Sequence, residues 1–178
     1  MNYLLRTVEI HDAERIFNWR NSKRVRENMY SDHIISHEEH ELWFDKILED
    51  PTVKYKICEL KGTPIGLVNF TEINKLHNRC FWGFYLGKSD LPTKAGPIME
   101  FLALEYAFKT LTVKKLCCEV LSFNSRVIKL HKKFGFREEG IFLKHIFKSG
   151  KYVDVVSLAM FDEEWTEKEP LMRKLLFR

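Results

Sequence analysis

The chain has 178 residues, 45% of them hydrophobic and 30% charged, which fits one folded domain over residues 1–178 and excludes intrinsic disorder. Its net charge of +4 comes from 29 basic and 25 acidic residues that are scattered along the chain, which argues against a nucleic-acid partner. The longest run without a charged residue covers only residues 62–71, and the first residues are charged, so we expect a cytoplasmic protein with no signal peptide and no membrane partner.

The first fifty residues predict one strand and two helices. Residues 3–8 form a short apolar run that is typical of a strand. Asp12 is expected to cap the first helix with its carboxylate. Ser36 and Glu39 have the spacing of a capping box, which predicts the start of a second helix that ends at Pro51. The apolar residues expected to point inward from this second helix are Leu42, Trp43, Ile47 and Leu48.

Three strand-like runs separated by short polar turns come next. They span residues 53–60, 64–73 and 79–86, and strands this close in sequence favour an antiparallel meander. A loop over residues 87–96 follows, and Pro97 suits the first turn of a helix.

The remaining residues predict a strand, a helix and a hairpin. The strand spans residues 115–121, and Asn124 and Gly135 are expected to cap the following helix at its two ends. Residues 140–147 and 152–161 would pair as a hairpin, and the charged tail after them would be helical. The order of elements predicts a mixed α/β fold whose strand–loop–helix crossover holds a ligand at the helix N-terminus, where free amides attract phosphate.

The segment from the strand at 79–86 through the loop resembles the GNAT acetyltransferases. That family binds the acetyl-CoA pyrophosphate on a loop with the pattern Gln or Arg, two residues, Gly, one residue, then Gly or Ala. The pattern falls on residues 91–96, where Gly96 matches and Lys94 replaces the first glycine, leaving a plain surface loop as the alternative. The resemblance implies a mostly antiparallel seven-stranded sheet with about four helices and a helical tail, and acetyl-CoA as co-substrate. Its expected contacts are Phe84, Tyr85, Leu86, Lys94, Ala95, Gly96 and Pro97.

Residues 119–136 resemble the fifth strand and fourth helix of the same family. The resemblance implies that Asn124 and Arg126 contact the cofactor, that Glu119 draws a proton from the amine, and that His131 stands where a tyrosine protonates the departing thiolate. Asn124 and His131 are seven residues apart and therefore share a helix face. An imidazolium can donate a proton near neutral pH. A core histidine and a salt-bridged carboxylate are the alternatives.

The chain also resembles one branch of this family, the UDP-4-amino-4,6-dideoxy-N-acetyl-β-L-altrosamine N-acetyltransferases of pseudaminic acid synthesis. The segments that carry this resemblance are residues 19–21, 28–36, 39–40, 70–73, 82–87 and 104–108. It implies a UDP-amino-sugar acceptor, with polar contacts from Arg20, His40 and Thr71, packing from Met29, Tyr30 and Trp43, and a sugar site lined by Tyr85. Glu72 departs from the pattern, because a basic residue can occur there. A solvated basic helix end with core aromatics is the alternative.

The expected reaction is direct attack of the amine on the thioester, with backbone amides near residues 85–87 stabilising the oxyanion. His33, His37 and His40 lack the His-Glu-x-x-His spacing of a zinc site, and we expect no metal. One alternative is a GNAT enzyme acting on a polyamine or a protein N-terminal amine, although a polyamine site should be rich in carboxylates. Another is a non-catalytic acyl-CoA-binding module. A homodimer is also open, since the sequence does not fix the oligomeric state.

Overall fold

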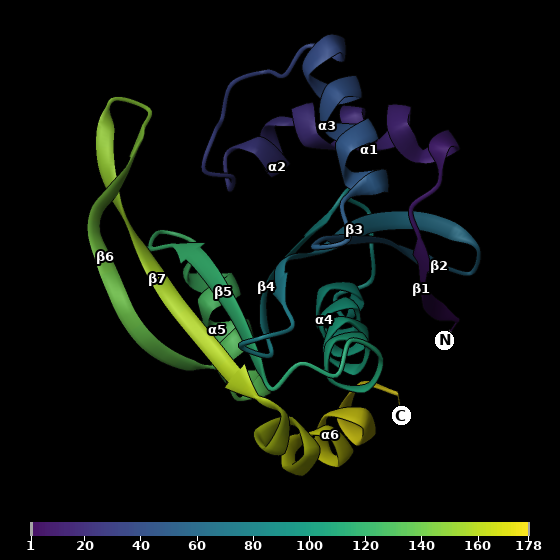
Figure 1. Cartoon of the computed structure of the whole chain (residues 1–178), viewed down its shortest axis with the longest axis vertical. Helices are drawn as coiled ribbons and strands as arrows, with labels where there is room; N and C mark the ends of the chain where they lie inside the picture. Colours follow the sequence, from purple (N-terminus) through teal and green to yellow (C-terminus); the bar gives the residue numbers. More distant parts are fainter. Residues whose placement is uncertain (1, 178) are drawn as a thin grey trace.

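A computed structural model describes residues 2–177, and its strands form one sheet in the order β1-β2-β3-β4-β5-β7-β6 (Figure 1). The strands are β1 (Tyr3–Thr7), β2 (Lys54–Leu60), β3 (Thr63–Asn74), β4 (Arg79–Leu86), β5 (Lys115–Leu121), β6 (Arg137–Lys148) and β7 (Lys151–Phe161). The helices are α1 (Ala13–Asn21), α2 (Lys23–Arg26), α3 (His37–Glu49), α4 (Ala95–Glu105), α5 (Ser125–Phe134) and α6 (Asp162–Leu176). A 3₁₀ turn, η1 (Ile10–Asp12), precedes α1, and a π-helical turn, η2 (Tyr106–Thr110), extends α4.

The predicted mixed and mostly antiparallel seven-stranded sheet is confirmed, and β4 and β5 are its parallel pair. The short helix α2 was not predicted, because four residues carry too little periodicity to identify a helix. Helix α4 begins at Ala95, before the expected start at Pro97. The β6–β7 hairpin begins earlier than predicted, at Arg137. Among the helices of residues 2–177, none combines the length and hydropathy needed to cross a membrane.

The ends of the helices follow local chemistry. Ser36 Oγ accepts from the amide of Glu39 at 3.1 Å, and the Glu39 carboxylate accepts from the amide of Ser36 at 2.8 Å, so the predicted capping box is confirmed. Asp12 stands at the cap position of α1 but makes no capping bond. Its buried carboxylate instead accepts from the guanidinium groups of Arg6 and Arg15, because a buried charge needs charged partners.

The prediction of the inward face of α3 was partly wrong. Trp43 and Ile47 point inward as expected, and they pack against a small core that contains Phe44. Leu42 and Leu48 are 68% and 46% exposed, because the face that α3 presents to α1 runs through His40 and Phe44 instead.

The two faces of the sheet carry separate cores. The larger core contains residues of α4, α5 and α6, such as Ile98, Phe134 and Trp165. The smaller core lies under α1 and α3 on the other face and includes Ile16 and Leu67. In Figure 1, α1–α3 lie together over one part of the sheet, while the β6–β7 hairpin rises at its other edge.

Strands β4 and β5 separate after three paired positions. Their pairing runs from Arg79 opposite Lys115 to Phe81 opposite Cys117. Beyond Phe81, β4 stays paired with β3 as far as Leu86, whereas β5 follows β7. A gap therefore opens in the middle of the sheet between the second halves of β4 and β5 (Figure 1).

Candidate active site

The side of β4 that faces the gap presents backbone amides. Gly87, directly after β4, donates its amide to the carbonyl of Ile65 in β3, at 2.7 Å. Successive amides of a strand point in opposite directions, so those of Leu86 and Phe84 point away from β3 and into the gap. Of the predicted amide donors near residues 85–87, Leu86 is therefore available, whereas Gly87 is occupied.

The N-terminus of α4 offers a small anion site. The amide of Ala95 donates to the carbonyl of Pro92, and Pro97 has no amide hydrogen. The amide of Gly96 remains for a ligand, and a side-chain atom added at Gly96 would meet only Leu86, at 3.9 Å, so a phosphate can approach closely. The ammonium of Lys94, beside this terminus, donates to the carbonyl of Leu175 in α6 at 3.1 Å, and its contact with a phosphate stays a prediction.

Asn124 stands at the N-terminus of α5 without capping it through its side chain. The predicted position of the cap is right, but its predicted hydrogen bond is not made. Because the carboxamide makes no capping bond, it can serve a ligand, and its contact with the pantetheine arm stays a prediction. Arg126 lies exposed in the first turn of the same helix.

His131 and Glu100 form a buried pair on the core side of the sheet. Nδ1 of His131 lies 2.8 Å from Oε1 of Glu100, and the two residues are 3% and 0% exposed. Burial lowers the pKa of His131, but the Glu100 carboxylate and the nearby Cys118 together outweigh burial and raise that pKa to about 10. Burial raises the pKa of Glu100, against the opposing charge of His131. The pair therefore retains a shared proton through neutral pH.

Glu100 was missed by the sequence analysis. The signal was present, because Glu100 interrupts the apolar run Ile98, Met99 and Phe101 of α4. A lone carboxylate on the buried face of a helix needs a partner of opposite charge. Nothing in the linear order identifies His131, thirty-one positions away, as that partner.

Glu119 lies on the opposite face of β5 from this pair. Its neighbours Cys118 and Val120 belong to the core shared with α4 and α5, so the alternation of the strand directs Glu119 toward the side of α1–α3. Its Oε2 accepts from the hydroxyl of Tyr30 at 2.5 Å. Burial, together with Glu119, raises the pKa of Tyr30 well above its ordinary value.

Arg20 and Tyr85 lie together on that same face. Arg20 Nη2 donates to the carbonyl and the hydroxyl of Ser31, at 2.7 and 3.0 Å. Its Nη1 is buried and has no partner in the part of the chain that the structure describes. Burial lowers the pKa of Arg20 and raises that of Tyr85. Their mutual interaction acts against burial, because Tyr85 raises the pKa of Arg20 and Arg20 lowers the pKa of Tyr85. Trp19 packs edge-on against Tyr85, with ring centres 6.5 Å apart.

Two predicted acceptor contacts occupy structural positions. His40 is buried between α3 and α1, where its Nε2 lies 2.8 Å from the carbonyl of Ala13. Trp43 packs edge-on against Tyr55 of β2, with ring centres 5.3 Å apart. These contacts hold α3 in place and do not bring either side chain to Glu119. Thr71 lies on β3 opposite Phe81, where the paired part of β4 and β5 ends.

The loop between α2 and α3, which carries Met29 and Tyr30, is fastened to the β6–β7 hairpin. Lys148, only 6% exposed, donates to the carbonyls of Met29 and Arg26, at 2.9 and 3.3 Å, and pairs with Asp32 at 3.2 Å. The sequence analysis missed Lys148, because this contact spans more than a hundred residues. It holds the loop over the face that carries Glu119.

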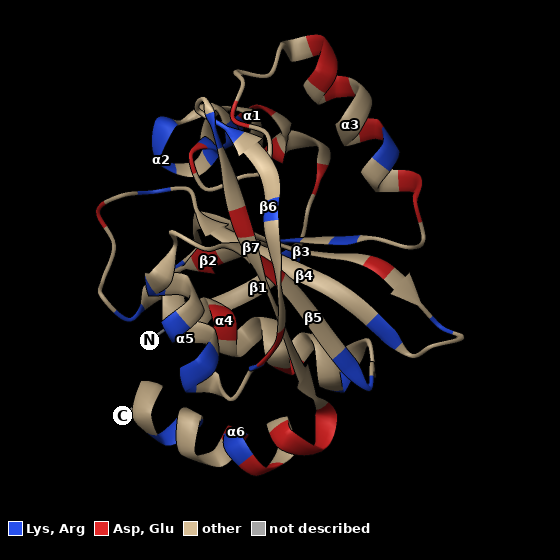
Figure 2. Cartoon of the chain, turned by 90° about the vertical axis from the view of Figure 1, so that its left-hand side faces the viewer, with Lys and Arg blue, Asp and Glu red and all other residues tan. Residues whose placement is uncertain are grey.

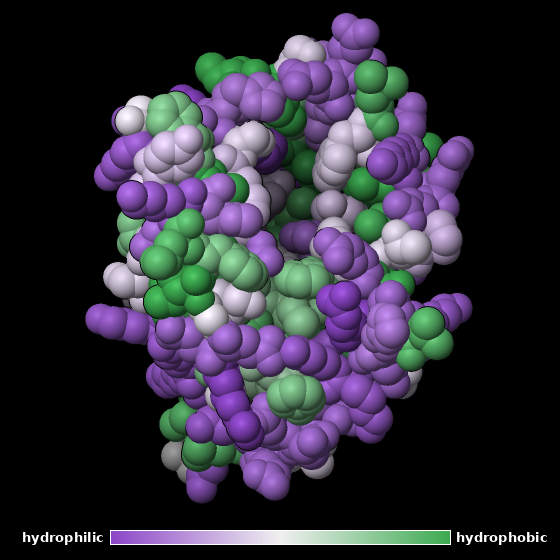
Figure 3. Space-filling view, turned by 60° about the vertical axis from the view of Figure 1, so that its left-hand side comes forward, coloured by the Kyte–Doolittle hydropathy of each residue, from purple (hydrophilic) through white to green (hydrophobic). Residues whose placement is uncertain are grey.

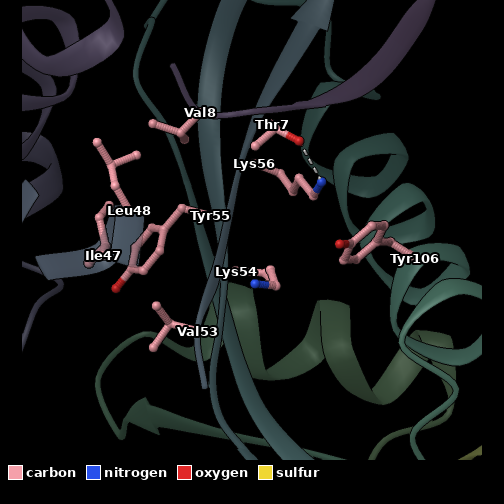
Figure 4. Close-up of a pocket in the computed structure, with 9 residues that line it drawn as sticks. All are labelled: Thr7, Val8, Ile47, Leu48, Val53, Lys54, Tyr55, Lys56 and Tyr106. Atoms are coloured by element: carbon pink, nitrogen blue, oxygen red, sulfur yellow. Dashed lines mark hydrogen bonds between the residues drawn. The ribbon is translucent and has the colours of Figure 1, made fainter. Parts of the chain in front are cut away.

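The molecule is hollowed on the side where β6 and β7 come forward, with apolar atoms deep in the hollow (Figure 3). A different hollow lies at the far edge of the sheet, where Lys54, Lys56 and Tyr106 line it (Figure 4). There Lys56 donates to Thr7 at 3.0 Å. Because β1 and β2 stand at the other edge from β6, this second hollow is separate from the gap between β4 and β5.

No group of three or more potential metal ligands occurs within residues 2–177. His33 pairs with Glu39 at 3.0 Å, and His37 stacks on Phe17 at 4.0 Å. With His40 directed at α1, the three histidines do not converge.

Comparisons with known proteins identify the family of the chain. Residues 2–137 match the family model described as acetyltransferase (GNAT) domain. The chain is 30% identical to spermidine N(1)-acetyltransferase of Escherichia coli over 127 residues, or 68% of this chain and 66% of that enzyme, just under two thirds. It is also 30% identical to acetyltransferase PseH of Campylobacter jejuni over 125 residues, covering 70% of this chain and 76% of that protein.

A comparison with solved structures also finds a spermidine N-acetyltransferase. The crystal structure of spermidine N-acetyltransferase from Vibrio cholerae in complex with CoA and spermine superposes with a TM-score of 0.87. The superposition covers 92% of this chain and 98% of the other, at 24% sequence identity. The match over residues 2–137 confirms the expected family, and the chain belongs to the GNAT acetyltransferases.

Proposed function

We propose that the chain transfers the acetyl group of acetyl-CoA to the 4-amino group of a UDP-amino-sugar. The observation that carries this proposal is the buried Nη1 of Arg20, which has no partner among the described residues and lies on the side of Tyr85 and Glu119. A desolvated guanidinium favours an anionic partner, and it binds phosphate oxygens in a fork. The diphosphate of a UDP-sugar supplies such a partner, whereas a polyamine would add positive charge.

The gap between β4 and β5 provides a route for the cofactor. The pyrophosphate would lie at Gly96, and the pantetheine would pass Asn124 and pair with the free amides of Phe84 and Leu86. These amides also stand where they can stabilise the oxyanion. Arg126, Ala95 and Pro97 are expected at the edge of this site.

The amine would then attack the thioester from the face of α1–α3. Glu119 draws a proton from the amine, directly or through water, and His131 returns one to the thiolate from the opposite face. Holding both substrates in one complex supplies much of the rate by proximity. Met29, Tyr30, Thr71 and Tyr85 would line the acceptor, while His40 and Trp43 support it by fixing α3.

A polyamine acceptor is the second candidate. The similarity to spermidine acetyltransferases favours it, and the comparisons taken alone support it more than they support a nucleotide sugar. Acidic residues are also exposed along α3, among them Glu38, Glu41 and Asp45 (Figure 2). A polycation could bind there, although these side chains lie on a helix separate from Glu119. A homodimer and a protein N-terminal amine acceptor stay open.

Acetyl-CoA turnover with a panel of amines tests the proposal. The panel contains a UDP-4-amino-4,6-dideoxy sugar, its dephosphorylated amino sugar, spermidine and a peptide with a free N-terminus. We expect the UDP-sugar to have the highest kcat/KM and loss of the diphosphate to lower it at least tenfold. A preference for spermidine would establish the second candidate, and acetyl-CoA binding without turnover on any amine would indicate a non-catalytic module.

A further inference from the structure

The pair of Glu100 and His131 connects the two helices on the core side of the gap. Glu100 comes from α4 and His131 from α5, and both are almost completely buried. Oε1 of Glu100 lies 2.8 Å from Nδ1 of His131. The Glu100 carboxylate accepts a hydrogen bond from Nδ1–H of His131. This contact fixes both the orientation of the ring and the nitrogen that faces α4.

The other surroundings of His131 are aromatic, apart from one thiol. The rings of Trp82 and Phe84 in β4 lie 5.3 and 6.1 Å from the imidazole, and Phe136 lies 5.2 Å away. From β5, the Cys118 thiol is within hydrogen-bonding reach. Glu100 and Cys118 are therefore the titratable groups that face His131 from the elements packed around it.

The second nitrogen of His131 is the one left for chemistry. Nδ1 is held by Glu100, so Nε2 is the nitrogen that the Cys118 thiol or a bound ligand can contact. Trp82 and Phe84 belong to the part of β4 that has separated from β5, so the imidazole lies beside the gap. A thioester sulfur bound in that gap would approach the ring from this side.

We propose that Glu100 is the positioning residue of the acid step: it holds Nδ1 of His131 so that Nε2 keeps a proton and delivers it to the thiolate of coenzyme A. This inference rests on the acetyl transfer proposed above. As the amine forms its C–N bond, the C–S bond breaks and sulfur leaves with the electron pair. Sulfur takes the Nε2 proton, and His131 becomes a neutral imidazole that keeps its Nδ1 proton and donates it in the hydrogen bond to Glu100. Solvent then restores the Nε2 proton.

The carboxylate partner explains how a histidine can do this work at alkaline pH. An unpaired histidine, with a pKa near 6.5, is mostly neutral above pH 7.5 and has no proton to give. Burial lowers the pKa of His131, but the Glu100 charge, together with the nearby Cys118, raises it to about 10 and so extends the protonated range. The alkaline fall in kcat should therefore begin well above pH 8.

Glu100→Gln separates the charge of Glu100 from its shape. The amide oxygen of glutamine can still accept a hydrogen bond from Nδ1–H of His131, but the negative charge is gone. We expect the pKa of His131, followed by ¹⁵N NMR, to fall by at least two units, and the alkaline limb of kcat to move down with it. The KM for acetyl-CoA should stay within twofold. Glu105→Gln, at the end of the same helix, is the matched control and should leave both quantities unchanged.

A purely structural role would give a different result. If the NMR titration moves but the pH profile of kcat does not, Glu100 does not act in the transfer. If neither the NMR titration nor the pH profile of kcat moves, Glu100 does not control the pKa of His131. Should Glu100→Gln fail to fold, Glu100→Asp keeps the charge and must keep the alkaline limb above pH 8, and a limb near neutral pH would overturn the proposal.

The His131→Phe background closes the test. If Glu100 acts only through His131, adding Glu100→Gln to His131→Phe should change kcat by less than twofold. A further tenfold loss would show that Glu100 works by another route. If the unmodified chain acetylates no amine, the proposed function fails, and the acid step fails with it. If the chain does transfer acetyl but the pH profile of kcat is the same in Glu100→Gln, only this inference is overturned.

Discussion

The hydroxyl of Tyr30 donates to Oε2 of Glu119 over 2.5 Å, joining the loop after α2 to the strand that borders the gap. These two residues are eighty-nine positions apart in the sequence. The contact places a proton donor on the carboxylate that would accept the amine proton. An acceptor that enters the site must therefore displace the hydroxyl or share Glu119 with it.

Glu119→Gln should lower kcat by about 10²–10⁴-fold, because the substitution keeps the shape of the side chain and removes the base. Activity should recover as the pH rises, since the free amine then predominates. Binding of acetyl-CoA, measured by calorimetry, should persist. Glu139→Gln, on exposed β6, serves as the control, and full activity of Glu119→Gln at pH 7 would show that Glu119 is structural.

Arg20→Ala should raise the KM for a UDP-amino-sugar about tenfold to a hundredfold, because a charged hydrogen bond contributes about 1.5–3 kcal/mol. The KM for acetyl-CoA should change little. Lys23→Ala, which removes an exposed cation one turn away, is the control. An unchanged acceptor KM in Arg20→Ala would remove the main support for an anionic acceptor.

The sequence predicted the order of the strands along the chain and the ends of α3 and α5, because these depend on local signals. The capping box at Ser36 and the glycine at Gly135, whose φ is 114°, are such signals. The contacts of Glu100 with His131 and of Lys148 with Met29 could not be predicted, since each joins distant segments. His40 was expected to contact the acceptor from the family resemblance alone, and the sequence could not show that its ring also contacts the carbonyl of Ala13 at the start of α1.

Lys148→Met should loosen the loop that carries Tyr30. The substitution removes the two carbonyl contacts and the pair with Asp32 while keeping most of the apolar stem. We expect a several-fold higher KM for the acceptor and faster hydrogen exchange over residues 27–36. Lys151→Met removes an exposed lysine from the same hairpin and should have neither effect. Equal behaviour of the two variants would rule out this role of Lys148.

Gly87→Ala should disturb the contact between the end of β4 and α1. A methyl group at Gly87 would lie 2.1 Å from Cδ2 of Trp19, a distance that forces the indole to move. Overpacking of this kind costs about 1–3 kcal/mol, and the shift would also move Tyr85, which packs on Trp19. Gly140→Ala, with nothing within 4 Å, is the control in chemical denaturation. Equal stability of the two variants would contradict the close approach.

The buried pair predicts how stability changes with pH. The folded-state pKa of His131 is raised to about 10 by Glu100, whereas in the unfolded chain it is near 6.5. The folded state therefore binds more protons at His131 between these two values. The free energy of unfolding contributed by His131 must be complete below pH 6.5 and fall as the pH rises toward 10. The slope can reach about 1.4 kcal/mol per pH unit.

The double variant Glu100→Leu/His131→Phe lacks both titratable groups, and its apolar replacements keep the site filled. Urea denaturation at pH 6, 8 and 9.5 should show the unmodified chain losing stability relative to the double variant across this range. A difference that stays constant with pH would mean that the pair does not hold its proton in the folded state.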